Sequence, residues 1–294
     1  MTNTRTIEKV LHPGSFNWVG DAFYTTSFIG KDIKRRRMDP FFALGYNADI
    51  EFEAQEIPRG VGPHPHKGFE TVTLAYKGKI AHRDSFGNHG VIGEGDVQWM
   101  TAGAGILHEE YHEEEWSQHG GTFQMVQIWM NLPAKDRETN PHYQDLLFDK
   151  MPKVSLENNG GTVNVVAGEY LGTKGIATTY SPINMFNVYL NKEGKASFTF
   201  PNHYNTAILV ISGSVKVNDN ETFEKDSFIL FTNEEGDTFT LEAITNETLV
   251  LILSGAPLNE PIAHYGPFVM NTQEQLQKAF EEYQSGKFGS IPAR

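Results

Sequence analysis

The sequence contains no cysteine among its 294 residues, so the chain can form no disulfide bond and offers no thiolate to a metal ion. Its stability therefore does not depend on the redox state of its compartment. No thiolate therefore competes with histidine nitrogens and carboxylate oxygens for a metal ion in this chain.

Positive charge and long apolar runs are also scarce. The chain has 24 Lys and Arg residues against 37 Asp and Glu residues, which gives a net charge of −13. A field of that sign repels polyanions, so we expect no direct binding of nucleic acid. No apolar stretch reaches the ~18 residues that a membrane span needs, and residues 1–10 lack the pattern of a signal peptide. We therefore expect a soluble cytoplasmic protein without a membrane partner, or a nuclear one if the source is eukaryotic.

What the sequence does contain is typical of a turn-rich globular protein of strands. It has 28 glycines and 14 prolines, and 39% of its residues are hydrophobic. The apolar stretch 123–130 predicts one long strand. One helix is predicted near the C-terminus, because Thr272 and Gln275 can form a capping box and Leu276 and Phe280 lie on one face of the following helix.

Two pairs of possible metal ligands share the same spacing. His64 and His66 are separated by one residue, and side chains at positions i and i+2 of a strand point to the same face. His108 and Glu110 repeat this spacing some forty residues later. On neighbouring strands of a barrel, the two pairs would converge as three nitrogens and one oxygen, a set that suits iron, manganese, cobalt, nickel, copper or zinc.

A lone His-x-His pair is most often an accident of the surface. Here, however, seven of the eleven histidines lie between His64 and His119. The arrangement is also close to the two-part signature of cupin barrels, in which the glutamate of the first motif binds the metal. That glutamate is Glu70 in this chain, so spacing alone leaves Glu70 and Glu110 as alternatives for the carboxylate ligand.

The second half of the chain looks like a weaker copy of the first. The stretch from 72 to 78 matches 207–213, and Asp96 matches Asp226. This correspondence places other residues at the positions of the four candidate ligands: Thr199 for His64, Pro201 for His66, Thr238 for His108 and Thr240 for Glu110. We therefore expect a second barrel without metal. The proline-punctuated stretch 133–152 is predicted to link the two halves, with a boundary near residue 140.

Residues 64–72 and 95–110 together resemble the pirin family of bicupins, and shorter matches at 39–41, 127–133, 143–146 and 266–272 extend the resemblance over nearly the whole chain. The resemblance implies an all-β fold of two cupin (jelly-roll) β-barrels in tandem with a short C-terminal helix. The expected domains are an N-terminal metal-binding cupin barrel at 1–140 and a C-terminal cupin barrel without metal, followed by the helix, at 141–294.

The resemblance also implies one divalent metal ion per chain, Fe(II) in the first place, with Mn, Ni, Co, Cu or Zn as alternatives. The implied ligands are His64, His66, His108 and Glu110. Glu70 then becomes a supporting residue beside the ligands rather than a ligand. His112, one step further along the same strand face, is a further candidate.

Two functions follow from this resemblance. The first is that of a quercetin 2,3-dioxygenase, which opens the ring of a flavonol with O₂ and releases carbon monoxide, with Glu110 as the catalytic base that takes the proton of the 3-hydroxyl. The second is regulation, by binding a transcription factor or a metabolic enzyme with the metal as a redox or structural switch. The acidic charge and the metal-free second barrel suit such a protein partner. In either case we expect a monomer.

Overall fold

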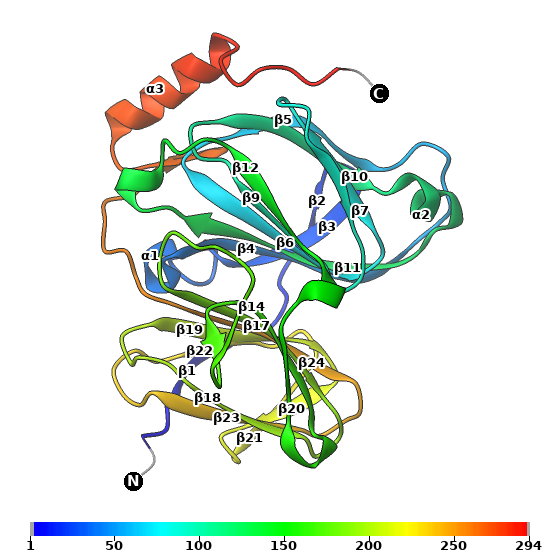
Figure 1. Cartoon of the computed structure of the whole chain (residues 1–294), viewed down its shortest axis with the longest axis vertical. Coiled ribbons are helices and arrows are strands. Elements are labelled where there is room, and N and C mark those ends of the chain that lie inside the picture. The colour runs from blue at the N-terminus through cyan, green and yellow to red at the C-terminus, as the bar shows by residue number, and fades with distance from the viewer. Residues whose placement is uncertain (1–2, 293–294) are drawn as a thin grey trace. The chain divides into compact units, whose positions relative to one another are not determined.

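The computed structural model describes residues 3–292, which form two compact units built mainly of β-strands (Figure 1). Unit 1 holds the chain up to Gly14, together with Asp32–Pro40 and Asp149–Pro257. Unit 2 holds Ser15–Lys31, Phe41–Phe148 and the chain from Leu258 on. The predicted all-β architecture of two barrels with a short C-terminal helix is confirmed.

Unit 2 contains a seven-stranded sheet of order β12-β9-β6-β11-β4-β3-β2, a four-stranded sheet of order β5-β10-β7-β8 and the pair β25-β26. All the strand pairings in it are antiparallel. Its strands are β2 (Asn17–Val19), β3 (Phe23–Ile29), β4 (Phe41–Phe52), β5 (Gly60–His66), β6 (Phe69–Lys77), β7 (Ile80–Asp84), β8 (His89–Ile92), β9 (Val97–Thr101), β10 (Ile106–His112), β11 (Gly121–Asn131), β12 (His142–Leu146), β25 (Ala263–Tyr265) and β26 (Phe268–Met270).

Unit 1 repeats this plan with a seven-stranded sheet of order β1-β22-β19-β24-β17-β14-β13, a four-stranded sheet of order β18-β23-β20-β21 and the pair β15-β16. Its strands are β1 (Ile7–Leu11), β13 (Lys153–Ser155), β14 (Gly161–Ala167), β15 (Glu169–Tyr170), β16 (Thr173–Lys174), β17 (Ile183–Leu190), β18 (Lys195–Thr199), β19 (Asn205–Ser212), β20 (Ser214–Val217), β21 (Glu221–Glu224), β22 (Phe228–Phe231), β23 (Thr238–Ala243) and β24 (Thr248–Gly255).

Helices are short in the described part of the chain. They are α1 (Arg35–Met38), α2 (Glu114–His119) and α3 (Gln273–Gln284), with 3₁₀ turns η1 (Ala134–Asp136), η2 (Phe148–Lys150) and η3 (Glu157–Asn159). The predicted capping box of α3 is confirmed, because Thr272 Oγ1 accepts a hydrogen bond from the Gln275 amide and Gln275 Oε1 accepts one from the Thr272 amide. Between residues 3 and 292, none of the helices is both long and apolar enough to cross a membrane.

The interiors of the two units differ in polarity. The barrel of unit 1 is filled by one apolar cluster to which almost every strand contributes, including Phe198, Phe231 and Phe239. In unit 2 the corresponding apolar cluster around Phe52 and Phe123 is smaller. The rest of that interior contains buried histidines and carboxylates. Since such polar groups are costly to bury without partners, the polar part of unit 2 is where a functional site is expected.

Each of the two units is made of several separate segments of the chain, whereas the predicted domains, 1–140 and 141–294, were continuous. The N-terminal strand β1 pairs with β22, so the chain up to Gly14 belongs to unit 1. The predicted linker contains β12, which pairs with β9 and extends unit 2 to Phe148. The C-terminal helix packs in unit 2, where Lys67 Nζ lies 3.1 Å from Glu282 Oε2. These are pairings between distant segments, which local patterns do not reveal.

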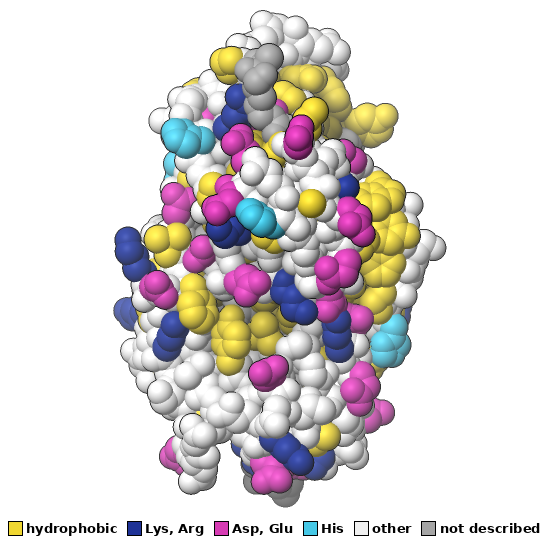
Figure 2. Space-filling view, turned by 90° about the vertical axis from the view of Figure 1, so that its right-hand side faces the viewer, with side chains coloured by type: hydrophobic (Ala, Val, Ile, Leu, Met, Phe, Trp, Pro, Cys, Tyr) yellow, Lys and Arg dark blue, Asp and Glu magenta, His cyan; other side chains and the backbone are white. Residues whose placement is uncertain are grey.

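The surface carries both signs of charge. Figure 2 shows acidic and basic side chains interspersed on the face that it displays, with a few histidines among them.

Candidate metal centre

The two predicted ligand pairs lie on adjacent strands of unit 2. β5 and β10 pair antiparallel, with His64 directly opposite His108. Directly opposite residues of an antiparallel pair point to the same face, so both imidazoles enter one space. The register shifts between His108 and Glu110, which brings Glu110 opposite Val61.

The local sequence suits this arrangement. Pro63 and Pro65 flank His64 on β5, and a proline cannot donate a hydrogen bond to a neighbouring strand. β5 is the edge of its sheet and pairs only with β10 there, so the missing donors disrupt little. The two fixed φ angles stiffen the segment that presents His64 and His66.

Three histidines converge at this point. One ligand atom from each of His64, His66 and His108 can be chosen so that all three lie within 4.8 Å of one another. The ring centroids are 4.3 Å apart for His64 and His108, 4.8 Å for His64 and His66, and 4.9 Å for His66 and His108. Among residues 3–292 this is the one group of three or more such side chains that could hold a metal ion.

The protonation and bonding of these rings fit a metal ligand set. His108 is fully buried, and neither of its ring nitrogens has a hydrogen-bond partner among the described residues. Burial, and then the neighbouring histidines, lowers the pKa of His66 and of His108 well below 6.5, which keeps both rings in the neutral form that binds metals. His64 Nδ1 lies 2.9 Å from the carbonyl oxygen of Gly62, a contact that leaves Nε2 for a metal. An unpartnered buried imidazole is costly, and a metal ion would satisfy it.

Glu110 lines the same cavity as His64 and His66. Its carboxylate accepts hydrogen bonds from Gln127 Nε2 at 2.9 and 3.1 Å, and Thr73 Oγ1 lies 3.5 Å from Glu110 Oε1. Burial raises the pKa of this carboxyl, while His64 and the hydrogen bonds act in the opposite direction. Sequence reasoning missed Gln127 and Thr73. Their only signal was a polar residue between two buried apolar neighbours on each strand.

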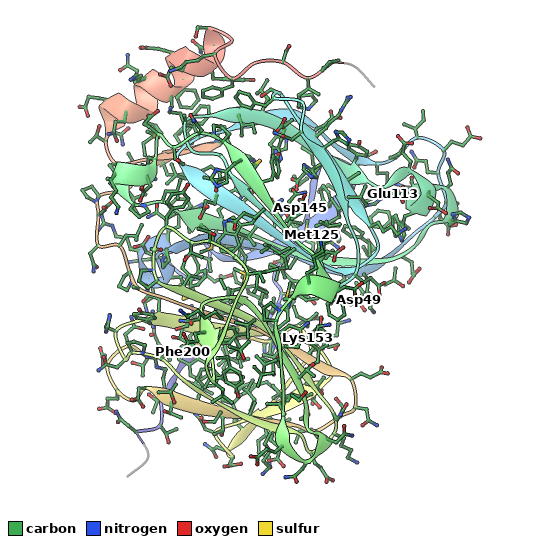
Figure 3. All side chains as sticks on the ribbon, viewed as in Figure 1. Asp49, Glu113, Met125, Asp145, Lys153 and Phe200 are labelled. Atoms are coloured by element: carbon green, nitrogen blue, oxygen red, sulfur yellow. The ribbon has the colours of Figure 1, made fainter. Side chains whose placement is uncertain are left out.

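A cavity of about 440 Å³ opens beside the histidines. Its walls are mostly apolar, and two of the three histidines, His64 and His66, line it together with Glu110 and Gln127. It is lined by Val19, Phe23, Thr25, Ser27, Ala43, Gly45, Val61, His64, His66, Glu110, Met125, Gln127 and Trp129. Figure 3 labels Met125 within unit 2. An apolar cavity with a few convergent polar groups is typical of a site for a small organic ligand.

Glu70, the alternative carboxylate, faces away from this cavity. It lies three residues before Thr73 on β6, and side chains three apart on a strand point to opposite faces. Thr73 is the one that approaches Glu110, whereas Glu70 accepts a hydrogen bond of 2.7 Å from Thr101 Oγ1. Burial raises the pKa of Glu70 to about 7. Glu70 is therefore not part of the group around the three histidines.

Other histidines of the cluster have structural surroundings. His112 is fully buried among aromatic rings, 4.6 Å from Phe52 and 4.8 Å from Trp116 between centroids, and its Nε2 lies 3.3 Å from the carbonyl oxygen of Ala22. His82 packs against Tyr143 at 4.7 Å. Neither belongs to the metal-binding group.

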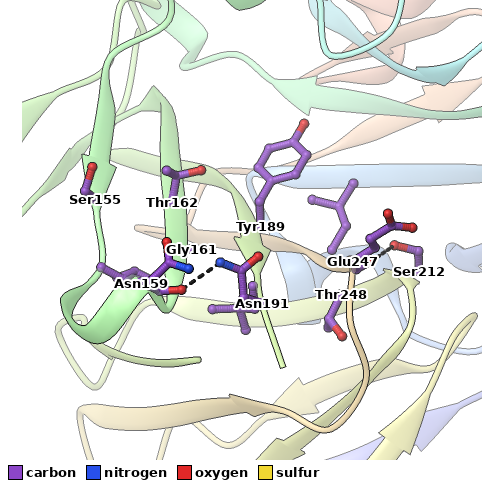
Figure 4. Close-up of a pocket in the computed structure, with 12 residues that line it drawn as sticks. Ser155, Asn159, Gly161, Thr162, Tyr189, Asn191, Ser212, Glu247 and Thr248 are labelled. Atoms are coloured by element: carbon purple, nitrogen blue, oxygen red, sulfur yellow. Dashed lines mark hydrogen bonds between the residues drawn. The ribbon is translucent and has the colours of Figure 1, made fainter. Parts of the chain in front are cut away.

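In unit 1 the corresponding position carries threonines. Thr199 on β18 lies opposite Thr238 on β23, as His64 lies opposite His108, and the two hydroxyls are hydrogen-bonded at 2.9 Å. This register agrees with the predicted correspondence between the two halves. A cavity of about 560 Å³ elsewhere in unit 1 is larger than that of unit 2, but none of the residues that line it is a histidine (Figure 4). Its hydrogen bonds join amides and hydroxyls to backbone carbonyls, such as Asn191 to Asn159 and Ser212 to Glu247.

Comparison with known proteins agrees with this architecture. Residues 22–130 match the family described as pirin, and residues 185–289 match the pirin C-terminal cupin domain. A Pseudomonas aeruginosa protein named "Putative quercetin 2,3-dioxygenase" is 42% identical over 272 residues, which cover 92% of this chain and 94% of that protein. The pirin of Rattus norvegicus is 36% identical over 263 residues, covering 88% and 85% of the two chains.

Solved structures show the same fold. The crystal structure of a quercetin 2,3-dioxygenase from Acinetobacter baumannii has a TM-score of 0.92 and 42% identity, covering 98% of this chain and all of that one. A bacterial pirin of Escherichia coli in complex with nickel(II) has a TM-score of 0.60 and 21% identity, covering 85% and 100% of the two chains. Two matched domains, relatives of high identity and a shared fold of two cupin barrels therefore lead to one conclusion: the chain belongs to the pirin family.

Proposed function

We propose that this protein is a metal-dependent dioxygenase that opens the central ring of a flavonol such as quercetin with O₂. The observation that carries the proposal is that the group of three histidines adjoins a mostly apolar cavity, which His64, His66 and Glu110 line. A flat, mostly apolar molecule with a few hydroxyls matches that distribution of surfaces. The names of the relatives from Pseudomonas and Acinetobacter support the same substrate class.

The residues that would hold the metal are His64, His66, His108 and Glu110, with Fe(II) as the first candidate. Three imidazole nitrogens and one carboxylate oxygen suit a first-row transition metal, although nickel, manganese, cobalt, copper or zinc suit the same donors. When bound, the metal supplies a Lewis acid that favours the ionised phenol and a place for O₂.

Glu110 is the residue that would act as the catalytic base. Its carboxylate lines the cavity and is held by Gln127, so it is positioned to accept the proton of the 3-hydroxyl. Burial raises the pKa of Glu110, which makes it a better proton acceptor than an exposed carboxylate. A divalent cation beside it would act in the opposite direction.

The remaining walls would bind the substrate and exclude water. Phe23, Val61, Met125 and Trp129 are apolar and line the cavity. The Trp129 ring lies 5.4 Å from the His66 ring between centroids, so the apolar wall reaches the histidines. Burying the rings of a flavonol there would contribute roughly 25 cal/mol for each Å² of apolar surface removed from water.

The test is turnover of a panel of flavonols by protein loaded with iron under anaerobic conditions and then exposed to O₂. We expect the flavonol absorption to disappear while O₂ is consumed and carbon monoxide is released. Protein that carries one iron per chain but converts no member of the panel would contradict the proposal. That result would favour the regulatory role, in which the protein binds a transcription factor or a metabolic enzyme.

A further inference from the structure

One wall of the cavity is formed by three neighbouring strands, β3, β4 and β11, with β4 in the middle. Ser27 on β3 lies opposite Gly45 on β4, and Gly45 lies opposite Gln127 on β11. Residues opposite one another on antiparallel strands point to the same face. Since Ser27 and Gln127 line the cavity, position 45 also faces it.

The residues of this wall differ in size in a regular way. The middle strand contributes the smallest residues and the flanking strands contribute larger ones, so the wall is hollowed along β4. We call this hollow the trough; its floor is Ala43 and Gly45, one side is Met125, Gln127 and Trp129, and the other side is Thr25 and Ser27. Its long direction follows β4, and Gln127, in the middle of the side made by β11, donates a hydrogen bond to Glu110.

The backbone does not require glycine at position 45. Its φ angle lies outside the left-handed region, and a Cβ atom there would have the carbonyl oxygen of Gln127 as its nearest neighbour at 3.9 Å, an ordinary van der Waals contact. Glycine inside a strand lowers stability relative to residues with a side chain. Space in the cavity is therefore what the missing side chain provides.

We propose that the trough takes one flat ring of an aromatic substrate and that Gly45 is the specificity-determining residue that sets its depth. The inference deepens the proposed function, on which it rests for the substrate class. The ring faces would contact Met125 and Trp129, which are apolar. Hydroxyls on the ring edge would meet Ser27, whose own hydroxyl donates to the carbonyl of Ile29 at 3.0 Å and so presents its oxygen as an acceptor.

The experiment fills the trough stepwise with Gly45→Ala, Gly45→Val and Gly45→Leu. Binding of quercetin and of catechol, a smaller ring, is measured by fluorescence on zinc-loaded protein, in which no turnover consumes the ligand. We expect Gly45→Val to weaken quercetin binding roughly tenfold or more, as for one or more methylene groups placed in an apolar pocket. Catechol binding should change less. The affinity for quercetin divided by that for catechol should therefore fall stepwise from Gly45→Ala to Gly45→Val to Gly45→Leu.

Two further readouts separate a filled trough from a damaged protein. The metal content of each variant should stay at the wild-type value, and the Tm of Gly45→Val should not fall, because valine is favoured in strands. Gly93→Val is the matched control, since a Cβ there also has its nearest atoms at 3.9 Å and Gly93 does not line the cavity. It should bind quercetin as the wild type does. If Gly45→Val does not fold, the affinity ratio of Gly45→Ala decides.

The outcomes distinguish the trough from the proposed function. Quercetin affinity within about twofold of wild type in Gly45→Val and Gly45→Leu, at unchanged metal content, would overturn the trough and leave the dioxygenase proposal standing. A stepwise loss of affinity in protein whose iron-loaded form converts no flavonol would support the trough and overturn the dioxygenase. If the wild type binds neither quercetin nor catechol, both the trough proposal and the dioxygenase proposal are contradicted.

Discussion

At the scale of single residues, two buried glutamates of unit 2 have opposite surroundings. Glu110 shares a cavity with histidines and accepts two hydrogen bonds from Gln127, whereas Glu70 faces the other side of its sheet and is bonded to Thr101. Both carboxyls have a raised pKa because both are buried. The pKa shift alone therefore does not identify which glutamate is functional, whereas the residues around each carboxylate do.

Replacing each glutamate by glutamine tests this difference. Glu110→Gln removes a metal ligand and the proton acceptor together, so flavonol turnover should fall by more than the 10²–10⁴-fold typical of a general base, with weaker metal binding. Glu70→Gln should keep its metal and lose activity by about 10-fold or less, because its hydrogen bond to Thr101 can be kept. Loss of metal from Glu70→Gln together with its retention in Glu110→Gln would reverse the assignment of the fourth ligand.

Glu70 also makes stability depend on pH. The carboxyl ionises near 4.5 in the unfolded chain and at about 7 in the folded protein. Between these values the folded state binds more protons, so its stability is highest below pH 4.5 and falls as the pH rises to about 7. The loss amounts to about 3 kcal/mol, and Glu70→Gln should avoid it.

Urea unfolding of metal-free protein at a series of pH values measures this effect. The stability of Glu70→Gln relative to wild type should increase from pH 4.5 to pH 8. Glu94→Gln, which removes one negative charge from an exposed turn, is the control. A difference between Glu70→Gln and wild type that does not change with pH would show that folding does not raise the pKa of Glu70.

At the scale of elements, buried cations hold the C-terminal segment in unit 2. The guanidinium of Arg137, which is 1% exposed, donates to the carbonyl oxygens of Gly68 at 2.7 Å and Val269 at 2.9 Å, and to the side chains of Asn131 and Asn271. Gly68 lies in the two-residue connection between β5, the strand that carries His64 and His66, and β6. Arg137 therefore connects β26 to the strand of the metal ligands.

Arg137→Lys should destabilise the protein by about 3 kcal/mol. A lysine ammonium cannot reproduce the planar set of guanidinium donors, so buried acceptors would be left unpaired. The midpoint of urea unfolding checks this, with Arg36→Lys at the exposed position of α1 as the matched control, expected to stay within about 0.5 kcal/mol of wild type. Equal midpoints for the two variants would show that these hydrogen bonds contribute little.

Local patterns predicted the elements that depend on neighbouring residues. The spacing of His64 and His66 on a strand and the capping box at Thr272 are confirmed, because i to i+2 alternation and N-capping are properties of a short segment. The face of Glu70 was left open by spacing, because it depends on how β6 pairs with β9 and β11. Gln127 was missed for the same reason.

At the scale of the whole molecule, the two units show one plan with different interiors. Each combines a seven-stranded and a four-stranded sheet, but the pair that is His64 and His108 in unit 2 is Thr199 and Thr238 in unit 1. The N-terminal segment belongs to unit 1 and the C-terminal segment to unit 2. This assignment was not predictable, since it requires pairing between strands as far apart in the sequence as β1 and β22. Long-range pairing is fixed by packing rather than by local sequence.

The central claim is that a single metal ion is bound per chain, by His64, His66, His108 and Glu110. The measurement that tests it most directly is metal analysis of purified, iron-loaded protein. We predict one equivalent in the wild type, less than one tenth of that in His108→Ala, and one equivalent in His203→Ala, which alters an exposed histidine of unit 1. Two equivalents in the wild type, or one equivalent retained by His108→Ala, would contradict the claim.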